Sequence, residues 1–130
     1  MIKKFEVEDI AKILDCEDEI ENYFPCDRGE WIQWLMSIVD NPKYFIAGVI
    51  EDGVVGYVVA VDNAVKPFGD HVFIRFFHSS KNIEIDMEIK AALNEWARSK
   101  KAVRVRFVGP EEALDQLQAE QKGIFGGWEL

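Results

Sequence analysis

The segment Val72–Ser99, VFIRFFHSSKNIEIDMEIKAALNEWARS, contains the change of pattern that decides the fold. Its first part, Val72–His78, is rich in aromatic and β-branched side chains and has large apolar groups on both faces, which predicts a central strand covered on both sides. From Ile83 to Ser99 the apolar side chains recur at helical spacing. They are Ile85, Ile89, Ala92, Leu93 and Trp96. Asn82 is a suitable N-cap for this predicted helix.

The strands on either side of this segment predict how the sheet is connected. Ala102–Val108 is a further β-branched strand, so the helix should cross over between two parallel neighbouring strands. Before the segment, Tyr44–Ile50 and Val54–Val61 are separated by Glu51-Asp52-Gly53, and Asp-Gly is a strong signal for a tight hairpin. The sheet is therefore expected to be mixed and mostly antiparallel.

The remaining elements complete a predicted order of β-α-α-β-β-β-α-β-α-β. Ile2–Phe5 is expected as a strand, Val7 to about Phe24 and Glu30–Asp40 as helices, a further helix from Pro110, and a short strand within Gly123–Leu130. We predict an α/β (α+β) fold in which about four helices flank the sheet. The 130 residues are expected to form a single domain.

Composition excludes several classes of function. The formal net charge of −9 argues against sequence-independent binding of nucleic acid, which needs a basic surface. The longest apolar runs are too short to span a bilayer, and the N-terminus MIKKFEVED has no signal-peptide core, so we expect a cytoplasmic protein and no membrane partner. The candidate metal ligands Cys16, Cys26, His71 and His78 match no zinc spacing, so no metal is expected.

The charge is nevertheless uneven along the chain. Glu6–Glu21 is strongly acidic, whereas Arg98–Arg106 contains only basic charged residues. These segments are either two solvated faces or, for the acidic first helix, a surface for a basic protein partner or an amine substrate. An acidic decoy that mimics nucleic acid is a more distant alternative, and the Arg98–Arg106 cluster argues against it.

The predicted order and three local stretches resemble the GNAT superfamily of N-acetyltransferases. FIAGVIEDGVVGYVVA (Phe45–Ala60) resembles the second and third strands of that family. MEIKAALNEWARSKKAVRVRFV (Met87–Val108) resembles its third helix and fifth strand, and Gly127-Trp128-Glu129 its closing motif. The resemblance implies transfer of an acetyl group from acetyl-CoA to an amine on a small molecule or a protein.

The chain departs from the family at the cofactor loop. There the family has the pattern Arg/Gln-x-x-Gly-x-Gly/Ala, whereas HSSKNIEID (His78–Asp86) has no glycine and three nearby acids, Glu84, Asp86 and Glu88. By resemblance, acetyl-CoA would contact the backbone from Phe76 and Phe77 through His78, Ser79, Ser80, Lys81 and Asn82. Without glycine, close approach of the backbone to phosphate is harder, and the acids instead suit a helix capped by its own residues.

The catalytic residues of the family are also incomplete. His78 is the candidate general base, because it ends the strand nearest the expected reaction centre. The tyrosine that often protonates the leaving thiolate corresponds to Leu117 or Gly123, depending on the alignment, and the usual asparagine corresponds to Pro110. The family's final strand is expected to be missing, or to come from a partner. The alternative is therefore an inactive GNAT-fold binding or assembly module, for example one encoded by a phage, and a homodimer that completes the sheet is one form of it.

Arg75 lies among large apolar residues of the predicted central strand. Since a lone buried charge is costly, we expect it to pair with a carboxylate across the sheet.

Overall fold

The computed structural model describes the chain except for residues 17–19, 64–68, 108–116, 118–119 and 123–124. Its centre is one sheet in the order β1-β2-β3-β4-β5-β7-β6. The strands are β1 Ile2–Lys4, β2 Tyr44–Ile50, β3 Val54–Asp62, β4 His71–His78, β5 Arg104–Phe107, β6 Glu120–Lys122 and β7 Phe125–Glu129. The helices are α1 Val7–Ile10, the 3-10 helix η1 Ala11–Asp15, α2 Ile20–Tyr23, α3 Arg28–Ile38 and α4 Ile83–Ser99.

The pairing confirms the predicted mixed α/β class. β4 and β5 are parallel and are joined through α4, whereas the other neighbouring strands are antiparallel. The hairpin between β2 and β3 turns at the predicted Glu51-Asp52-Gly53, and Gly53 has a φ of 138°. Because glycine adopts this region readily, the turn explains why Gly53 stands there.

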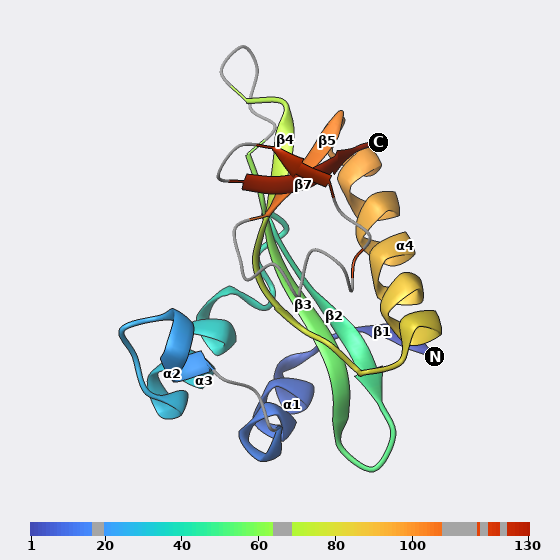
Figure 1. Cartoon of the computed structure of the whole chain (residues 1–130). Helices are drawn as coiled ribbons and strands as arrows, with labels where there is room; N and C mark the ends of the chain where they lie inside the picture. The colour runs from blue at the N-terminus through green and yellow to red at the C-terminus, as the bar shows by residue number, and fades with distance from the viewer. Residues whose placement is uncertain (17–19, 64–68, 108–116, 118–119, 123–124) are drawn as a thin grey trace.

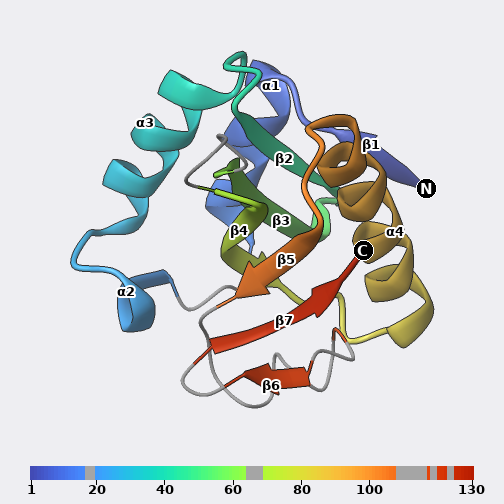
Figure 2. The ribbon, with the colours of Figure 1, turned by 90° about the horizontal axis from the view of Figure 1, so that it is seen from above.

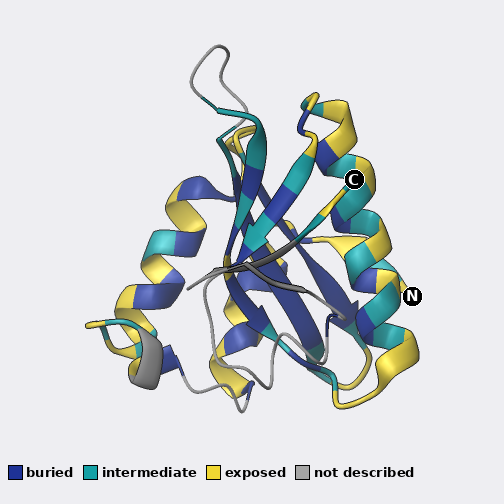
Figure 3. Ribbon diagram, turned by 45° about the horizontal axis from the view of Figure 1, so that its top comes forward, coloured by how far each residue is buried: buried dark blue, intermediate teal, exposed yellow. Residues whose placement is uncertain are grey.

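Helices cover the sheet on both faces (Figure 2). α4 lies on one face, above a core that includes Ile74, Phe77 and Leu93. α1, η1 and α3 lie on the other face, around a core that includes Leu35, Tyr57 and Phe76. Figure 3 shows the buried residues concentrated in the central strands and on the inner sides of the helices. β4 is a central strand, as expected from Val72–His78, and Phe76 and Phe77 are buried on its two opposite faces. The expected cover on both sides does not extend to Arg75, which is exposed.

A bulge in β4 decides which face of the sheet Phe76 and Phe77 each occupy. Val59 is paired with Phe76 and Ala60 with Ile74, so Arg75 is the extra residue. A bulge shifts the alternation of side chains by one position. Ile74 and Phe77 therefore face α4, while Phe76 faces α3. Arg75 itself is exposed, and no carboxylate in the described part of the chain pairs with it, so the predicted ion pair is wrong.

The single helix expected from Val7 to Phe24 is wrong. The chain leaves helical geometry at Cys16, whose ψ is 134°. Arg28 of α3 donates hydrogen bonds to the carbonyl groups of Leu14 and Cys16, which would otherwise be unsatisfied at this helix end. The sequence also places acids four residues apart, Asp15 with Glu19, and like charges at this spacing destabilise a helix.

The expectation that the final strand is missing or comes from a partner is corrected by the structure. Glu120–Lys122 and Phe125–Glu129 form an antiparallel pair, and β7 lies beside β5 along Arg104–Phe107. The polar stretch Glu120–Lys122 has no alternation of apolar residues, so the sequence pattern did not reveal β6. The helix predicted from Pro110 lies largely outside the described residues.

Candidate functional site

β4 is paired with its parallel neighbour β5 from His71 with Arg104 to Ile74 with Phe107, as far as the structure describes β5. Phe76, Phe77 and His78 continue the pairing of β4 with β3. The resemblance places the cofactor along this C-terminal half of β4.

The loop after β4 is closed by a carboxylate of the helix that follows. Asp86, in the first turn of α4, is only 2% exposed. Its Oδ2 accepts a hydrogen bond from Ser79 Oγ at 2.6 Å. Its Oδ1 accepts from the Ser80 backbone N–H at 2.9 Å and from Ser80 Oγ at 2.7 Å. An anionic group of the protein itself thus occupies the donors at the start of this loop.

The next backbone donors of the loop also have internal acceptors. Lys81 N–H donates to Ser79 Oγ at 3.0 Å, and Asn82 N–H donates to Ser80 Oγ at 3.1 Å. Asn82 Oδ1 accepts from the N–H groups of Glu84 at 2.9 Å and Ile85 at 3.5 Å, which confirms Asn82 as the N-cap. These N–H groups would be the phosphate ligands in an open anion site at a helix N-terminus.

The spacing of the family's loop pattern shows which residues of this chain stand at the pattern's small-residue positions. Counted from Lys81 in the position of the Arg/Gln, Glu84 and Asp86 stand where the pattern has its two small residues. In the sequence, Asp86 is one of several acids at the start of the predicted helix, and its burial was not predicted. The helical spacing did indicate that Asp86 is buried. It lies three residues before Ile89, seven before Leu93 and eleven before Ala97, all of which are buried on α4.

Gly56 of β3 allows the loop to lie close to the sheet. A Cβ atom at Gly56 would stand 2.9 Å from the carbonyl oxygen of His78 and 3.0 Å from the backbone nitrogen of Ser80. The first distance is shorter than real Cβ contacts, the second is tighter than most of them, and both involve backbone atoms. The Gly-aromatic-aliphatic stretch at Gly56–Val59 therefore supports the position of the loop as well as the strand.

His78 lies at the end of β4, as the sequence predicts. It is half-buried and in register with Tyr57, with 5.9 Å between the two ring centroids. Tyr57 is fully buried, and its hydroxyl accepts a hydrogen bond from Trp31 Nε1 at 3.1 Å. The site thus contains a histidine beside an aromatic cluster that includes Phe76, and this geometry leaves the proposed role of His78 as a base untested.

Neither alignment provides a proton donor at the tyrosine position of the family. Leu117 is 1% exposed and has no ionisable side chain, while Gly123 and Pro110 lie outside the described residues. Lys90 of α4 instead donates to the Leu117 carbonyl at 2.7 Å, and its Nζ lies 4.3 Å from the centroid of the Trp128 ring. Burial lowers the pKa of Lys90. These contacts join α4 to the C-terminal part of the chain.

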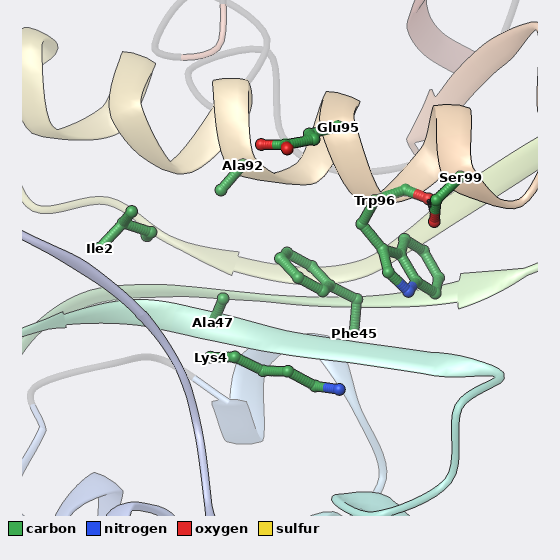
Figure 4. A pocket seen from close by; sticks show the side chains of 8 residues that line it. All are labelled: Ile2, Lys4, Phe45, Ala47, Ala92, Glu95, Trp96 and Ser99. Carbon is green, nitrogen blue, oxygen red and sulfur yellow. Dashed lines mark hydrogen bonds between the residues drawn. The ribbon is translucent and has the colours of Figure 1, made fainter.

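A hollow lies between α4 and strands β1 and β2, away from the loop after β4 (Figure 4). This open groove of about 380 Å³ has the stacked rings of Phe45 and Trp96, with centroids 5.2 Å apart, beside the small residues Ala47 and Ala92. It is formed by the packing of α4 against the edge of the sheet and contains none of the predicted cofactor-loop residues.

Neither a metal-binding group nor a membrane-spanning helix is found in the part of the chain that the structure describes. In that part of the chain no three His, Cys, Asp or Glu side chains are grouped so that they could hold a metal ion. None of the helices in it is both long and apolar enough to cross a bilayer.

Comparison with solved structures identifies the fold. A ribosomal-protein-alanine N-acetyltransferase from Brucella melitensis matches with a TM-score of 0.70 and 19% identity, covering 100% of this chain and 99% of that one. The chain has the GNAT fold. A GNAT-family acetyltransferase from Streptococcus pneumoniae matches with a TM-score of 0.68 and 12% identity over 100% and 99% of the two chains. A GNAT-family acetyltransferase from Brucella melitensis in complex with acetyl-CoA matches with 0.67 and 12% over 100% and 87%.

The likeness rests on the structure, because the sequence comparisons found no match. No protein-family model matches the chain, and no curated protein matches it. At these identities the likeness establishes the GNAT fold alone.

Proposed function

We propose that this GNAT-fold chain is a binding module that does not transfer acetyl groups. The observation that carries the proposal is the buried carboxylate of Asp86, hydrogen-bonded to Ser79 and Ser80 where a cofactor phosphate would need the same donors. The absence of a proton-donating side chain at Leu117 also supports it. The GNAT fold is then a scaffold for recognition, as folds commonly are.

The energetic argument favours a closed loop. Hydrogen bonds to charged groups contribute about 1.5–3 kcal/mol each, so giving up two of the three Asp86 contacts to admit a diphosphate costs on the order of 3–6 kcal/mol. That weakens cofactor binding by about 10²–10⁴-fold, because each 1.4 kcal/mol is a factor of ten. The displaced carboxylate would also stay near the phosphates and repel them.

Calorimetry with acetyl-CoA tests the proposal. We expect no binding by the natural chain at millimolar cofactor. The double variant Glu84→Gly with Asp86→Gly, which places glycine at both pattern positions, should gain measurable affinity if it remains folded by circular dichroism. Glu88→Gln removes one exposed acid from the same helix and serves as the matched control.

One outcome overturns the proposal whether or not the glycine variant folds. Micromolar binding of acetyl-CoA by the natural chain, weakened by Lys81→Glu, would mean that the loop accepts the cofactor despite Asp86. The search would then turn to amine substrates.

The second candidate is acetyl transfer from acetyl-CoA to an amine. The observation that favours it is the position of His78, which ends β4 beside the loop where the resemblance places the cofactor. In this mechanism the segment from Phe76 to Asn82 would contact the cofactor, and His78 would accept the proton of the attacking amine. Release of free CoA thiol with a panel of amines, compared between the natural chain and His78→Gln across pH, tests it.

Protein partners remain a proposal for two surfaces. Glu6 and Glu8 at the start of α1 are exposed and suit a basic partner, whereas Asp9 is already paired with Lys3. β1 and β6 are the outer strands of the sheet and suit a homodimer. Sedimentation of the purified chain, alone and at raised salt, separates these alternatives.

A further inference from the structure

We infer that the face formed by Phe73, Arg75 and Arg106 binds a small oxyanion, a carboxylate or phosphate group carried by a small molecule. This face lies on β4 and β5, on the side of the sheet opposite to α4. Val105 and Phe107 of β5 belong to the core under α4, so the alternating residues Arg104 and Arg106 point to the other side.

Arg106 is a partly buried cation without a partner in the described part of the chain. Its Nε is buried and makes no hydrogen bond, and no carboxylate described by the structure lies within ion-pair distance. The neighbouring Arg104 differs, because its charge is balanced by Asp70 at 3.6 Å and Glu129 at 3.5 Å. The Nε atoms of both arginines are buried without a hydrogen bond, which is costly, but only Arg104 has carboxylates within ion-pair distance. An acceptor supplied from outside is therefore most favourable at Arg106.

Phe73 is a neighbour of Arg106 and also contacts a second cation, Arg75. Its backbone is in register with Arg106 on the adjacent parallel strand. The Arg75 guanidinium lies over the Phe73 ring, 5.3 Å from the centroid. The Arg75 guanidinium therefore borders the ring of the residue that is paired with Arg106, and Arg75 is the bulge residue of β4.

The face is open to a ligand as far as the structure describes it. Arg75 is exposed, Phe73 and Arg106 are half-buried, and Phe73 belongs to neither core cluster. On the other side of Arg106, its paired residue on β7 is Gly127. Figure 2 shows that α3 lies toward β2, away from β5 and β7.

The chemistry defines the ligand class. A guanidinium group offers a planar fork of donors that matches the oxygens of a carboxylate or a phosphate, and the Phe73 ring supplies an apolar surface beside it. The net charge of −9 disfavours a long polyanion such as nucleic acid, which would meet repulsion outside this small face. A compact anion avoids that repulsion.

This inference deepens the proposed function by naming a ligand for the binding module, and the two proposals can fail separately. Acetyl-CoA binding reports on the loop around Asp86, whereas anion binding reports on Arg75 and Arg106. Arg75 follows Ile74, whose pair with Phe107 is the last β4–β5 pair that the structure describes.

The experiment follows the arginine Nε–H signals by NMR during titration with inorganic phosphate and, separately, succinate at constant ionic strength. We expect a saturable shift of the Arg75 and Arg106 signals. Arg106→Gln should weaken binding, read at Arg75, by about tenfold or more, as expected for loss of a paired charge. Arg98→Gln, an exposed arginine at the end of α4, is the matched control and should change nothing.

The two probes distinguish the sources of the anion. A response to phosphate alone indicates a phosphate-bearing ligand, and a response to succinate alone indicates a carboxylate. Shifts that do not saturate, or that are equally large at Arg98, would show general screening and overturn the inference. If Arg106→Gln does not fold, Arg75→Gln replaces it, with loss of the Arg106 shift as the readout, because Arg75 is exposed and its replacement leaves the core unchanged.

Discussion

The carboxylate of Asp86 accepts hydrogen bonds from both the backbone N–H and the hydroxyl of Ser80, at 2.9 and 2.7 Å. This contact joins the first turn of α4 to the loop that leaves β4. In a GNAT fold the same loop is where the resemblance places the phosphates of acetyl-CoA. The chain thus uses one of its own acids to satisfy the donors that a cofactor would otherwise need.

Replacing Asp86 by Ala should reduce the free energy of unfolding by about 2–4 kcal/mol. The change removes a charged acceptor and leaves the Ser80 N–H without a partner in a part-buried site. Chemical denaturation measures the loss. Glu88→Ala, one exposed acid further along α4, should cost much less. Equal effects of the two replacements would mean that the Asp86 contacts contribute little to the fold.

Replacing Gly56 by Ala should displace the loop. The added methyl group would meet the backbone of His78 and Ser80 at about the 2.9 and 3.0 Å distances that separate a Cβ from those atoms. Because backbone cannot rotate away, we expect a loss of about 1–3 kcal/mol, the usual cost of overpacking. Amide shifts should change from His78 to Asn82. Gly29→Ala in α3, whose new Cβ would meet only the Asp27 side chain, at 3.3 Å, is the control.

Asp9 should make the fold sensitive to acid. Burial by itself would raise the pKa of Asp9, but the hydrogen bond from the Glu6 backbone and the ammonium groups of Lys3 and Lys12 outweigh burial, so its pKa is lowered. A carboxyl group whose folded pKa is lowered stabilises the fold above its unfolded pKa, about 3.9, and this contribution is lost as the pH falls through the folded value.

Asp9→Ala should therefore cost about 1–2 kcal/mol near neutral pH, including the lost helix cap, and much less in strong acid. Urea unfolding at a series of pH values measures the cost of the replacement near neutral pH and in strong acid. Glu8→Ala, an exposed neighbour on α1, controls for a general change of charge. A difference between Asp9→Ala and the natural chain that stays constant down to strong acid would contradict the linkage.

Cys26 should react slowly as a thiol. Burial raises the pKa of Cys26 most, and the negative charges of Glu30, Asp27 and Glu21 raise it further. Since the thiolate is the reactive form, alkylation near neutral pH should be several-fold slower than for a free cysteine and should rise only at more alkaline pH. Iodoacetamide kinetics on Cys16→Ser, which leaves a single thiol, measures this. A rate equal to that of free cysteine at pH 7 would contradict it.

The sequence predicted the elements whose formation depends on residues that lie close together in the chain. The bounds of β2 and α4, the Asn82 cap and the hairpin at Gly53 were predicted because periodicity, capping and turn chemistry involve residues close in sequence. The break at Cys16 was missed, since the carbonyl groups freed there are satisfied by Arg28 from another helix. β6 was missed because its pairing with β7, rather than its own side chains, makes it a strand.

By itself, the sequence determined the order of elements, the mixed sheet and the absence of glycine from the loop after β4. Tertiary structure alone decided what fills that loop and which arginines keep a partner. Asp86 and Ser80 are six residues apart, on two different elements, and only the turn at the end of β4 brings a carboxylate onto that backbone N–H. Likewise, only the pairing of β4 with β5 places Arg106 beside Phe73, because strand register is set by contacts between distant parts of the chain.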